Sequence, residues 1–190
     1  MPARVWIASV AFAALASAAG SAGAETTIIG NGLAAECSSA ATGVANNQPA
    51  RGEGERACTL AIEGEPLSPH EAAATYVNRG VLYLSDRAVA DARRDFEQAL
   101  RIEPNLPEAL VDRGAALIAG GHDKDGADEI TRGLALNPTQ PEKAYYNRAV
   151  AEERLGDLRS AYLDYRKAGD LKPDWPLPKT ELARFRVSAP

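Results

Sequence analysis

Few residues of this 190-residue chain have the types and spacing that enzyme chemistry requires. The two histidines, His70 and His122, lie in no metal-ligand spacing such as His-x-x-x-His, so we interpret both as solvated surface groups. Asp123 and Asp125 precede Gly126 as at the start of a calcium loop, but the remaining ligands and the late glutamate are missing. We therefore expect no metal site and no catalytic histidine.

The sequence contains no motif for nucleophilic catalysis or nucleotide binding. Gly-x-Ser-x-Gly, a phosphate-binding loop and a dinucleotide-binding fingerprint are all absent. The formal net charge of −5 also lacks the basic footprint that phosphate groups require, which makes nucleic acid and anionic lipid poor candidate partners. We expect that the protein is not an enzyme and uses no cofactor.

The first 24 residues have the features of an export signal. Arg4 gives a positive start, residues 5–19 form an uncharged, alanine-rich run, and Ala22-Gly23-Ala24 offers small residues for a signal peptidase. The alternative is a membrane span, but the run is shorter than the roughly 20 residues a span needs. We expect residues 1–24 to be removed, leaving a periplasmic or secreted protein without stable membrane insertion.

The two cysteines, Cys37 and Cys58, lie close to the start of the expected mature chain. In an oxidising compartment an isolated pair of this kind most often forms a structural disulfide, which is our prediction. A redox-active pair is the alternative, although such pairs usually have Cys-x-x-Cys spacing and a polarising neighbour. The bond would hold together two short helices within residues 25–67, which we interpret as an N-terminal cap.

A four-residue sequence motif recurs three times and indicates which helices make up the rest of the chain. Each copy lies in an expected first helix and is followed by an expected second helix that closes before a proline. The closing prolines at positions 104, 138 and 173 are 34 and 35 residues apart, a period typical of helical repeat arrays that bind partners. The copies are Val77-Asn78-Arg79-Gly80, Val111-Asp112-Arg113-Gly114 and Tyr146-Asn147-Arg148-Ala149.

Large and small residues also recur in a fixed order around each copy. The order resembles that of the tetratricopeptide repeat, a 34-residue helix–turn–helix, over residues 73–173. Two departures fall in or near the third copy: Glu152 replaces a large apolar residue, and residues 139–141 contain one extra residue. The matching series are Tyr76, Gly80, Tyr83, Ala92, Phe96, Ala99 and Pro104; Leu110, Gly114, Leu117, Gly126, Ile130, Gly133 and Pro138; and Tyr145, Ala149, Glu152, Ala161, Tyr165, Ala168 and Pro173.

The resemblance implies an all-α fold: a right-handed α-solenoid like that of tetratricopeptide repeats, with a disulfide-linked N-terminal cap and a C-terminal capping helix. The repeats would occupy residues 73–106, 107–141 and 142–175, within a repeat region of residues 68–187. Ser68, Pro69 and Glu71 have the spacing of a capping box before the first repeat. Trp175, Phe185 and an amphipathic helix over about residues 178–187 would close the array.

Each expected hairpin contains an arginine and an acidic residue sixteen positions later. The three matched offsets predict ion pairs that join the two helices of each hairpin, with the arginine stems packed against apolar neighbours. The alternative is three solvated arginines that are free to bind a ligand. The pairs are Arg79 with Asp95, Arg113 with Glu129, and Arg148 with Asp164.

A second stripe on the first helices is the candidate partner site. Its members lie three or four residues apart, so each set shares one helical face. In repeat arrays the first helices line the hollow side, where an apolar stripe with interleaved polar groups would suit a peptide. The predicted partner-binding residues are Val77, Asn78, Val81, Leu84, Val111, Asp112, Ala115, Ile118, Tyr146, Asn147 and Val150.

These features favour a non-catalytic module that binds a protein or peptide partner in the concave groove of a periplasmic array. The family's lysine and asparagine set for gripping a C-terminal carboxylate is absent, so that mode of recognition is not expected. The stripe could instead be covered by the N-terminal segment or by self-association. A self-associating structural protein of the cell envelope is therefore the alternative function.

Overall fold

The computed structural model describes residues 32–45 and 52–185, so the expected export signal, residues 1–24, lies outside the described residues. Within these two ranges the secondary structure is entirely helical, without strands. The helices are α1 (Leu33–Ala45), α2 (Gly52–Gly64), α3 (Pro69–Ser85), α4 (Val89–Ile102), α5 (Pro107–Ala119), α6 (Asp123–Ala135), α7 (Pro141–Leu155), α8 (Leu158–Leu171) and α9 (Pro176–Leu182).

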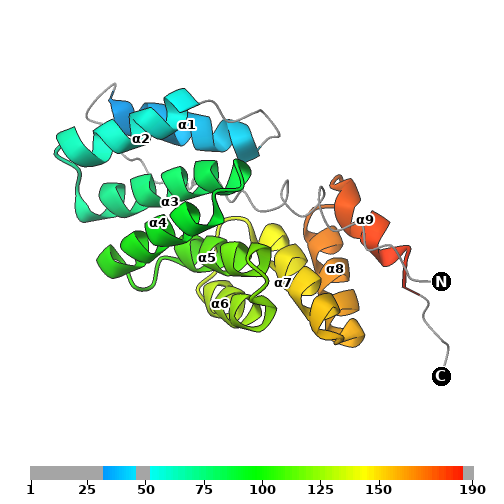
Figure 1. The fold of residues 1–190 in the computed structure, drawn as a ribbon. Coiled ribbons are helices and arrows are strands. Elements are labelled where there is room, and N and C mark those ends of the chain that lie inside the picture. Colours follow the sequence, from blue (N-terminus) through cyan, green and yellow to red (C-terminus); the bar gives the residue numbers. More distant parts are fainter. Residues whose placement is uncertain (1–31, 46–51, 186–190) are drawn as a thin grey trace.

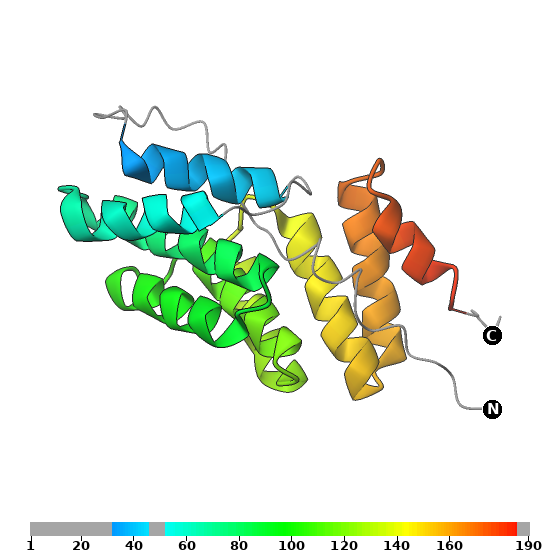
Figure 2. The same cartoon turned by 45° about the horizontal axis from the view of Figure 1, so that its top comes forward.

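The helices form hairpins that stack side by side into one array. Figure 1 shows the pairs α1–α2, α3–α4, α5–α6 and α7–α8 following one another, with α9 against the last pair. The turned view in Figure 2 shows the same order of pairs. Each second helix also packs against the first helix of the following pair. The prediction of an all-α stack of helical repeats is therefore confirmed.

Proline begins four of the helices that open a pair or close the array. Pro69, Pro107, Pro141 and Pro176 stand in the first turn of α3, α5, α7 and α9, where a missing backbone N–H costs no helical hydrogen bond. The predicted capping box of α3 is present, because the Ser68 hydroxyl accepts from the backbone N–H of Glu71 and the Glu71 carboxylate accepts from the backbone N–H of Ser68. Local sequence thus fixes where each hairpin starts.

In the turn inside each of the three repeats, one residue has a left-handed backbone conformation. Gly121 and Gly156 have φ of 83° and 87°, which glycine adopts without steric strain. Arg87 occupies the corresponding turn of the first repeat with φ of 63°, although its side chain makes this conformation less favourable. The chain therefore reverses in the same way in each repeat, even where glycine is lacking.

Close approach of the two helices in a hairpin depends on a small residue facing a large one. A Cβ atom added to Gly80 would lie 2.5 Å from the Phe96 ring. One added to Gly114 would lie 2.6 Å from Ile130 Cγ1 and 2.7 Å from the carbonyl oxygen of Gly126. Both distances are shorter than van der Waals contact, so only glycine fits between these helices as they stand.

The N-terminal hairpin is held by the predicted disulfide. Cys37 of α1 and Cys58 of α2 are bonded, with an S–S distance of 2.09 Å, and both are fully buried. The helix α2 repeats the pattern of a second helix, since Gly54, Cys58 and Ala61 have the same spacing as Gly126, Ile130 and Gly133. The cap is thus a degenerate repeat in which a cysteine stands where the repeats have their large core residue.

The closing helix is shorter than the sequence predicts and starts earlier. It covers Pro176–Leu182 instead of about residues 178–187, of which residues 186 and 187 lie outside the described ranges. The chain turns after Leu182, and Phe185 packs against Tyr165 with ring centroids 6.0 Å apart. Trp175, just before α9, packs against Tyr146 at 5.0 Å. Aromatic packing on both sides of α9 therefore closes the array.

We predict that Gly114→Ala lowers the free energy of unfolding by about 2 kcal/mol, because the new methyl group forces α5 and α6 apart. Urea denaturation followed by circular dichroism at 222 nm measures the change. Gly64→Ala is the matched control, since an added Cβ there meets no atom within 4 Å, and it should leave stability unchanged or slightly raised. Equal stability of the two variants would contradict the close-packing argument.

Candidate functional site

The residues predicted to bind a partner all lie on the first helices α3, α5 and α7, but they are not open to solvent. Only Val150 is partly exposed. The buried members are Val77, Asn78, Val81, Leu84, Val111, Asp112, Ala115, Ile118, Tyr146 and Asn147. The expectation of an open apolar surface is therefore wrong for these side chains, whereas their role in partner binding stays a prediction.

The apolar members are buried because they belong to the core of the stack. Leu84 of α3 shares one apolar cluster with Ala116 of α5. In the same way, Ile118 of α5 shares a cluster with Ala151 of α7. Small alanines let neighbouring repeats approach, and the larger side chains fill the remaining space. Part of the predicted stripe thus joins one repeat to the next.

The polar members form what we term the polar row: Asn78 of α3, Asp112 of α5, and Asn147 and Lys143 of α7. Their exposed fractions are 3%, 0%, 2% and 8%, which is unusual for amide and charged side chains. Burial lowers the pKa of the Lys143 ammonium group, and the nearby charge of Asp112 opposes this shift. The row therefore brings polar groups of all three repeats into the interior of the array.

Asn78 of the polar row has a buried side-chain atom without a hydrogen bond. Its Oδ1 is buried and accepts no hydrogen bond from the described residues. A buried carbonyl oxygen without a donor costs about 1–3 kcal/mol, so such a group usually has a structural or functional reason. The Asn78 side chain can accept a hydrogen bond from a donor that a binding partner supplies.

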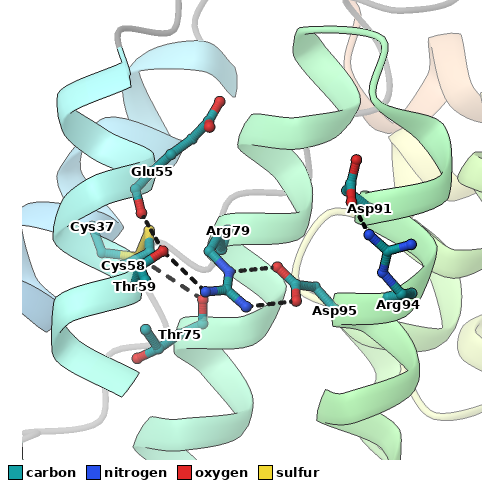
Figure 3. Close-up of polar contacts among 9 residues, drawn as sticks. All are labelled: Cys37, Glu55, Cys58, Thr59, Thr75, Arg79, Asp91, Arg94 and Asp95. Atoms are coloured by element: carbon teal, nitrogen blue, oxygen red, sulfur yellow. Dashed lines mark hydrogen bonds and ion pairs between the residues drawn. A yellow bond between two sulfur atoms is a disulfide. The ribbon is translucent and has the colours of Figure 1, made fainter. Parts of the chain in front are cut away.

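The predicted arginine pairs are present in all three repeats. Arg79 Nε and Nη2 donate to the two carboxylate oxygens of Asp95 at 2.7 and 2.8 Å (Figure 3). Arg148 Nε and Nη2 likewise donate to the two carboxylate oxygens of Asp164, at 2.6 and 3.0 Å. In the middle repeat, Arg113 Nη2 donates to Glu129 at 2.7 Å. The alternative of three solvated arginines free to grip a ligand is therefore wrong.

Each of the outer two arginines also reaches the preceding hairpin, which the sequence analysis missed. Arg79 Nη1 donates to Thr59 of α2 at 3.0 Å, and Arg148 Nη1 donates to Thr131 of α6 at 3.0 Å. Both threonines directly follow the core residue of their helix, Cys58 or Ile130. That shared place was the sequence signal that could have revealed these bonds.

Arg79 and Arg148 lie close to aromatic rings. The guanidinium carbon of Arg79 lies 5.5 Å from the Tyr76 ring centroid and 5.8 Å from that of Tyr83, within range of a cation–π interaction. The hydrogen bond to Asp95 raises the pKa of the Arg79 guanidinium against the opposing effect of burial. These groups bind each other, so their role is to hold the hairpins together.

Neither histidine takes part in a candidate metal centre. His70 Nδ1 lies 3.1 Å from both carboxylate oxygens of Glu103, and the His122 residue precedes α6 in a turn. Across residues 32–45 and 52–185, no three histidine, cysteine, aspartate or glutamate residues are grouped so that they could hold a metal ion. None of the described helices combines the length and apolarity that crossing a membrane requires.

Comparison with known proteins agrees with this architecture. The family profile "Tetratricopeptide repeat" matches residues 73–106 and 142–174, which contain α4, α8 and most of α3 and α7. Two of the four described hairpins thus match the tetratricopeptide repeat family. The repeat is a protein-interaction module, and its family is a scaffold family that is typically non-catalytic.

Two solved structures share the fold. A crystal structure of MamA has a TM-score of 0.58 and 19% sequence identity, over 75% of this chain and 80% of that one. A MamA RS-1 ArsTM double mutant has a TM-score of 0.60 and 20% identity, over 80% of this chain and 82% of that one. At such identity the likeness concerns the arrangement of helices alone.

Glu152 is the main departure of the third tetratricopeptide repeat from the usual pattern. Its carboxylate lies where the first two repeats have Tyr83 and Leu117, and its Oε2 is buried without a hydrogen bond from the described residues. Burial raises the pKa of Glu152 to about 7, Asp164 and Asp157 add to the rise, and Arg148 at 3.7 Å opposes it. An acidic residue thus replaces apolar packing at this position.

We predict that Asp95→Ala lowers the free energy of unfolding by about 3 kcal/mol, because it leaves the half-buried Arg79 guanidinium without its counter-charge. Chemical denaturation measures the loss. Asp91→Ala is the control, since Asp91 pairs with Arg94 at the surface and should contribute less than about 0.5 kcal/mol (Figure 3). A small effect of Asp95→Ala would mean that the pair is not needed for the hairpin.

We predict that stability falls as pH rises from about 5 to 8 and that Glu152→Gln removes part of this fall. The raised pKa means that the folded protein keeps a proton on Glu152 in this window after the unfolded chain has released it. The Glu152 side chain is 18% exposed, so solvent reduces the effect to on the order of 2 kcal/mol. Denaturation midpoints at several pH values measure it, and parallel profiles for the two proteins would refute it.

Proposed function

We propose that this protein is an exported, non-catalytic tetratricopeptide repeat module that holds an extended segment of a partner protein against its polar row. The partner's main-chain amide groups would hydrogen-bond with Asn78 and Asn147, and its side chains would pack beside Val150. The cell compartment proposed is the periplasm or the exterior. The observation that carries this proposal is the buried, unsatisfied Oδ1 of Asn78.

The chemistry of the row suits a peptide backbone. An asparagine side chain offers one acceptor and two donors, which match the N–H and C=O groups that alternate along an extended chain. Asn78 and Asn147 occupy the same place in the first and third repeats, so one segment could meet both. The mixed charges of Asp112 and Lys143 between them favour an uncharged stretch of the partner over a terminal carboxylate.

Burial of the row has a kinetic consequence. A partner reaches these groups only after side chains around them move, and association that requires such a change is slower than about 10⁵ M⁻¹s⁻¹.

Export is supported by the signal-like residues 1–24 and by the formed Cys37–Cys58 bond, because disulfides persist in oxidising compartments.

We predict that Asn78→Ala and Asn147→Ala each weaken binding about tenfold to a peptide selected from a random library on the purified protein. Isothermal titration calorimetry measures the affinities, and amide chemical shifts locate the peptide. Asn105→Ala, the same change at an exposed residue between α4 and α5, is the control and should leave affinity unchanged.

Chemical shifts confined to α4, α6 and α8 would contradict the proposed site, as would equal affinities for all three variants. A native mass of two or more chains that persists at low concentration, with no peptide selected, would instead favour self-association. Circular dichroism of each variant separates loss of binding from loss of fold.

A further inference from the structure

We propose that the N-terminal hairpin α1–α2 is a redox-dependent end piece, folded against α3 only while the Cys37–Cys58 bond is intact. Reduction would unfold this hairpin and leave α5 to α8 folded. The disulfide thereby decides whether the first face of the array is covered. This property of the cap is independent of which partner the protein binds.

The core of the cap contains only small side chains. Its buried residues within the described ranges are two cysteines, three alanines and one glycine, whereas Leu60 of α2 is 45% exposed. Each following hairpin instead buries a large side chain at the same place, namely Phe96, Ile130 or Tyr165. The apolar area that stabilises α1–α2 from within is therefore much smaller than that of the repeats.

The covalent bond replaces this missing packing. Cys58 has the position of Phe96 and Ile130 in its helix, and the bond brings the Cα atoms of Cys37 and Cys58 to 4.7 Å. In the chain-entropy model, a disulfide that closes a 21-residue separation raises the equilibrium constant for folding of the hairpin about 100-fold. A hairpin with so small a core depends on a contribution of this size.

Polar contacts also hold the cap at its edges, in addition to its apolar contact with α3. The Glu65 carboxylate accepts from the backbone N–H groups of Leu33 and Ala34 at 2.6 and 3.1 Å. Thr59 accepts from Arg79, and in Figure 3 it lies next to the disulfide on the side that faces α3. Unfolding of the hairpin would thus remove the acceptor of Arg79 Nη1, while the bonds of Arg79 to Asp95 remain.

The surface that the cap covers is apolar. Buried residues Ala73 and Leu82 of α3 belong to the same cluster as Cys37 and Ala41 of α1. Leu82 also lies close to Gly54 of α2, since a Cβ added to that glycine would be 3.3 Å from the leucine. Unfolding of the cap therefore exposes an apolar end of the array, while each later repeat keeps its own neighbours.

The reaction needs a dithiol reductant such as dithiothreitol. The protein S–S bond breaks, an S–S bond forms within the reductant, and two electrons and two protons pass to Cys37 and Cys58, which become thiols. Both cysteines are fully buried, so a thiolate reaches a sulfur only after the hairpin opens. The rate of reduction should therefore follow the opening of the cap.

Hydrogen–deuterium exchange with mass spectrometry tests the proposal on the purified protein, oxidised and after reduction by dithiothreitol. We expect amides of residues 33–45 and 52–64 to exchange about 100-fold faster after reduction, and those of residues 107–171 to change less than about threefold. The double variant Cys37→Ser and Cys58→Ser should reproduce the reduced pattern without reductant.

Two results would overturn the proposal. Protection of the cap within threefold of the oxidised level after reduction would show that the hairpin folds without its disulfide. Equal loss of protection in α1–α2 and in α5–α8 would show that the cap is no separate unit. The conservative variant Ala41→Gly, which keeps the disulfide, is the control and should retain most of the cap's protection.

Discussion

The first two repeats depend on one helix leaving room for a side chain of the other. Gly80 admits the Phe96 ring, and Gly114 admits Ile130, at distances where a methyl group would collide. This close approach also brings each arginine within reach of its acidic partner, so the apolar and ionic contacts of a hairpin form together. In the cap, Gly54 of α2 approaches Ala40 of α1 in the same way, and the bond between Cys37 and Cys58 joins the two helices covalently.

The contacts inside a hairpin could be predicted from the sequence because their spacing is short and repeated. The capping box of α3, the disulfide and the sixteen-residue offset between Arg79 and Asp95 all involve residues within one hairpin or at its start. Helical geometry relates such spacings directly to faces, so a pattern repeated three times defines both helices and their contact.

Contacts between hairpins could not be predicted in the same way. Leu84 of α3 and Ile118 of α5 lie on corresponding faces of their helices, as expected, but whether such a face is open depends on how closely the next repeat approaches. The bond of Arg79 to Thr59 likewise depends on the stacking of two pairs. The place of Asn78, Asp112 and Asn147 on the first helices was predictable, whereas their burial and the presence of Lys143 in the polar row were not.

The threonine bonds have a consequence for the mechanics of the array. Arg79 joins α3 to α2, and Arg148 joins α7 to α6, but within the described ranges Arg113 of α5 is bonded to Glu129 alone. At the matching place in α4, directly after Phe96, stands the exposed Glu97. The joint between α4 and α5 therefore lacks an arginine–threonine bond of this kind, and the two repeats meet through apolar packing, such as the cluster that contains Leu84 and Ala116, which sets no direction.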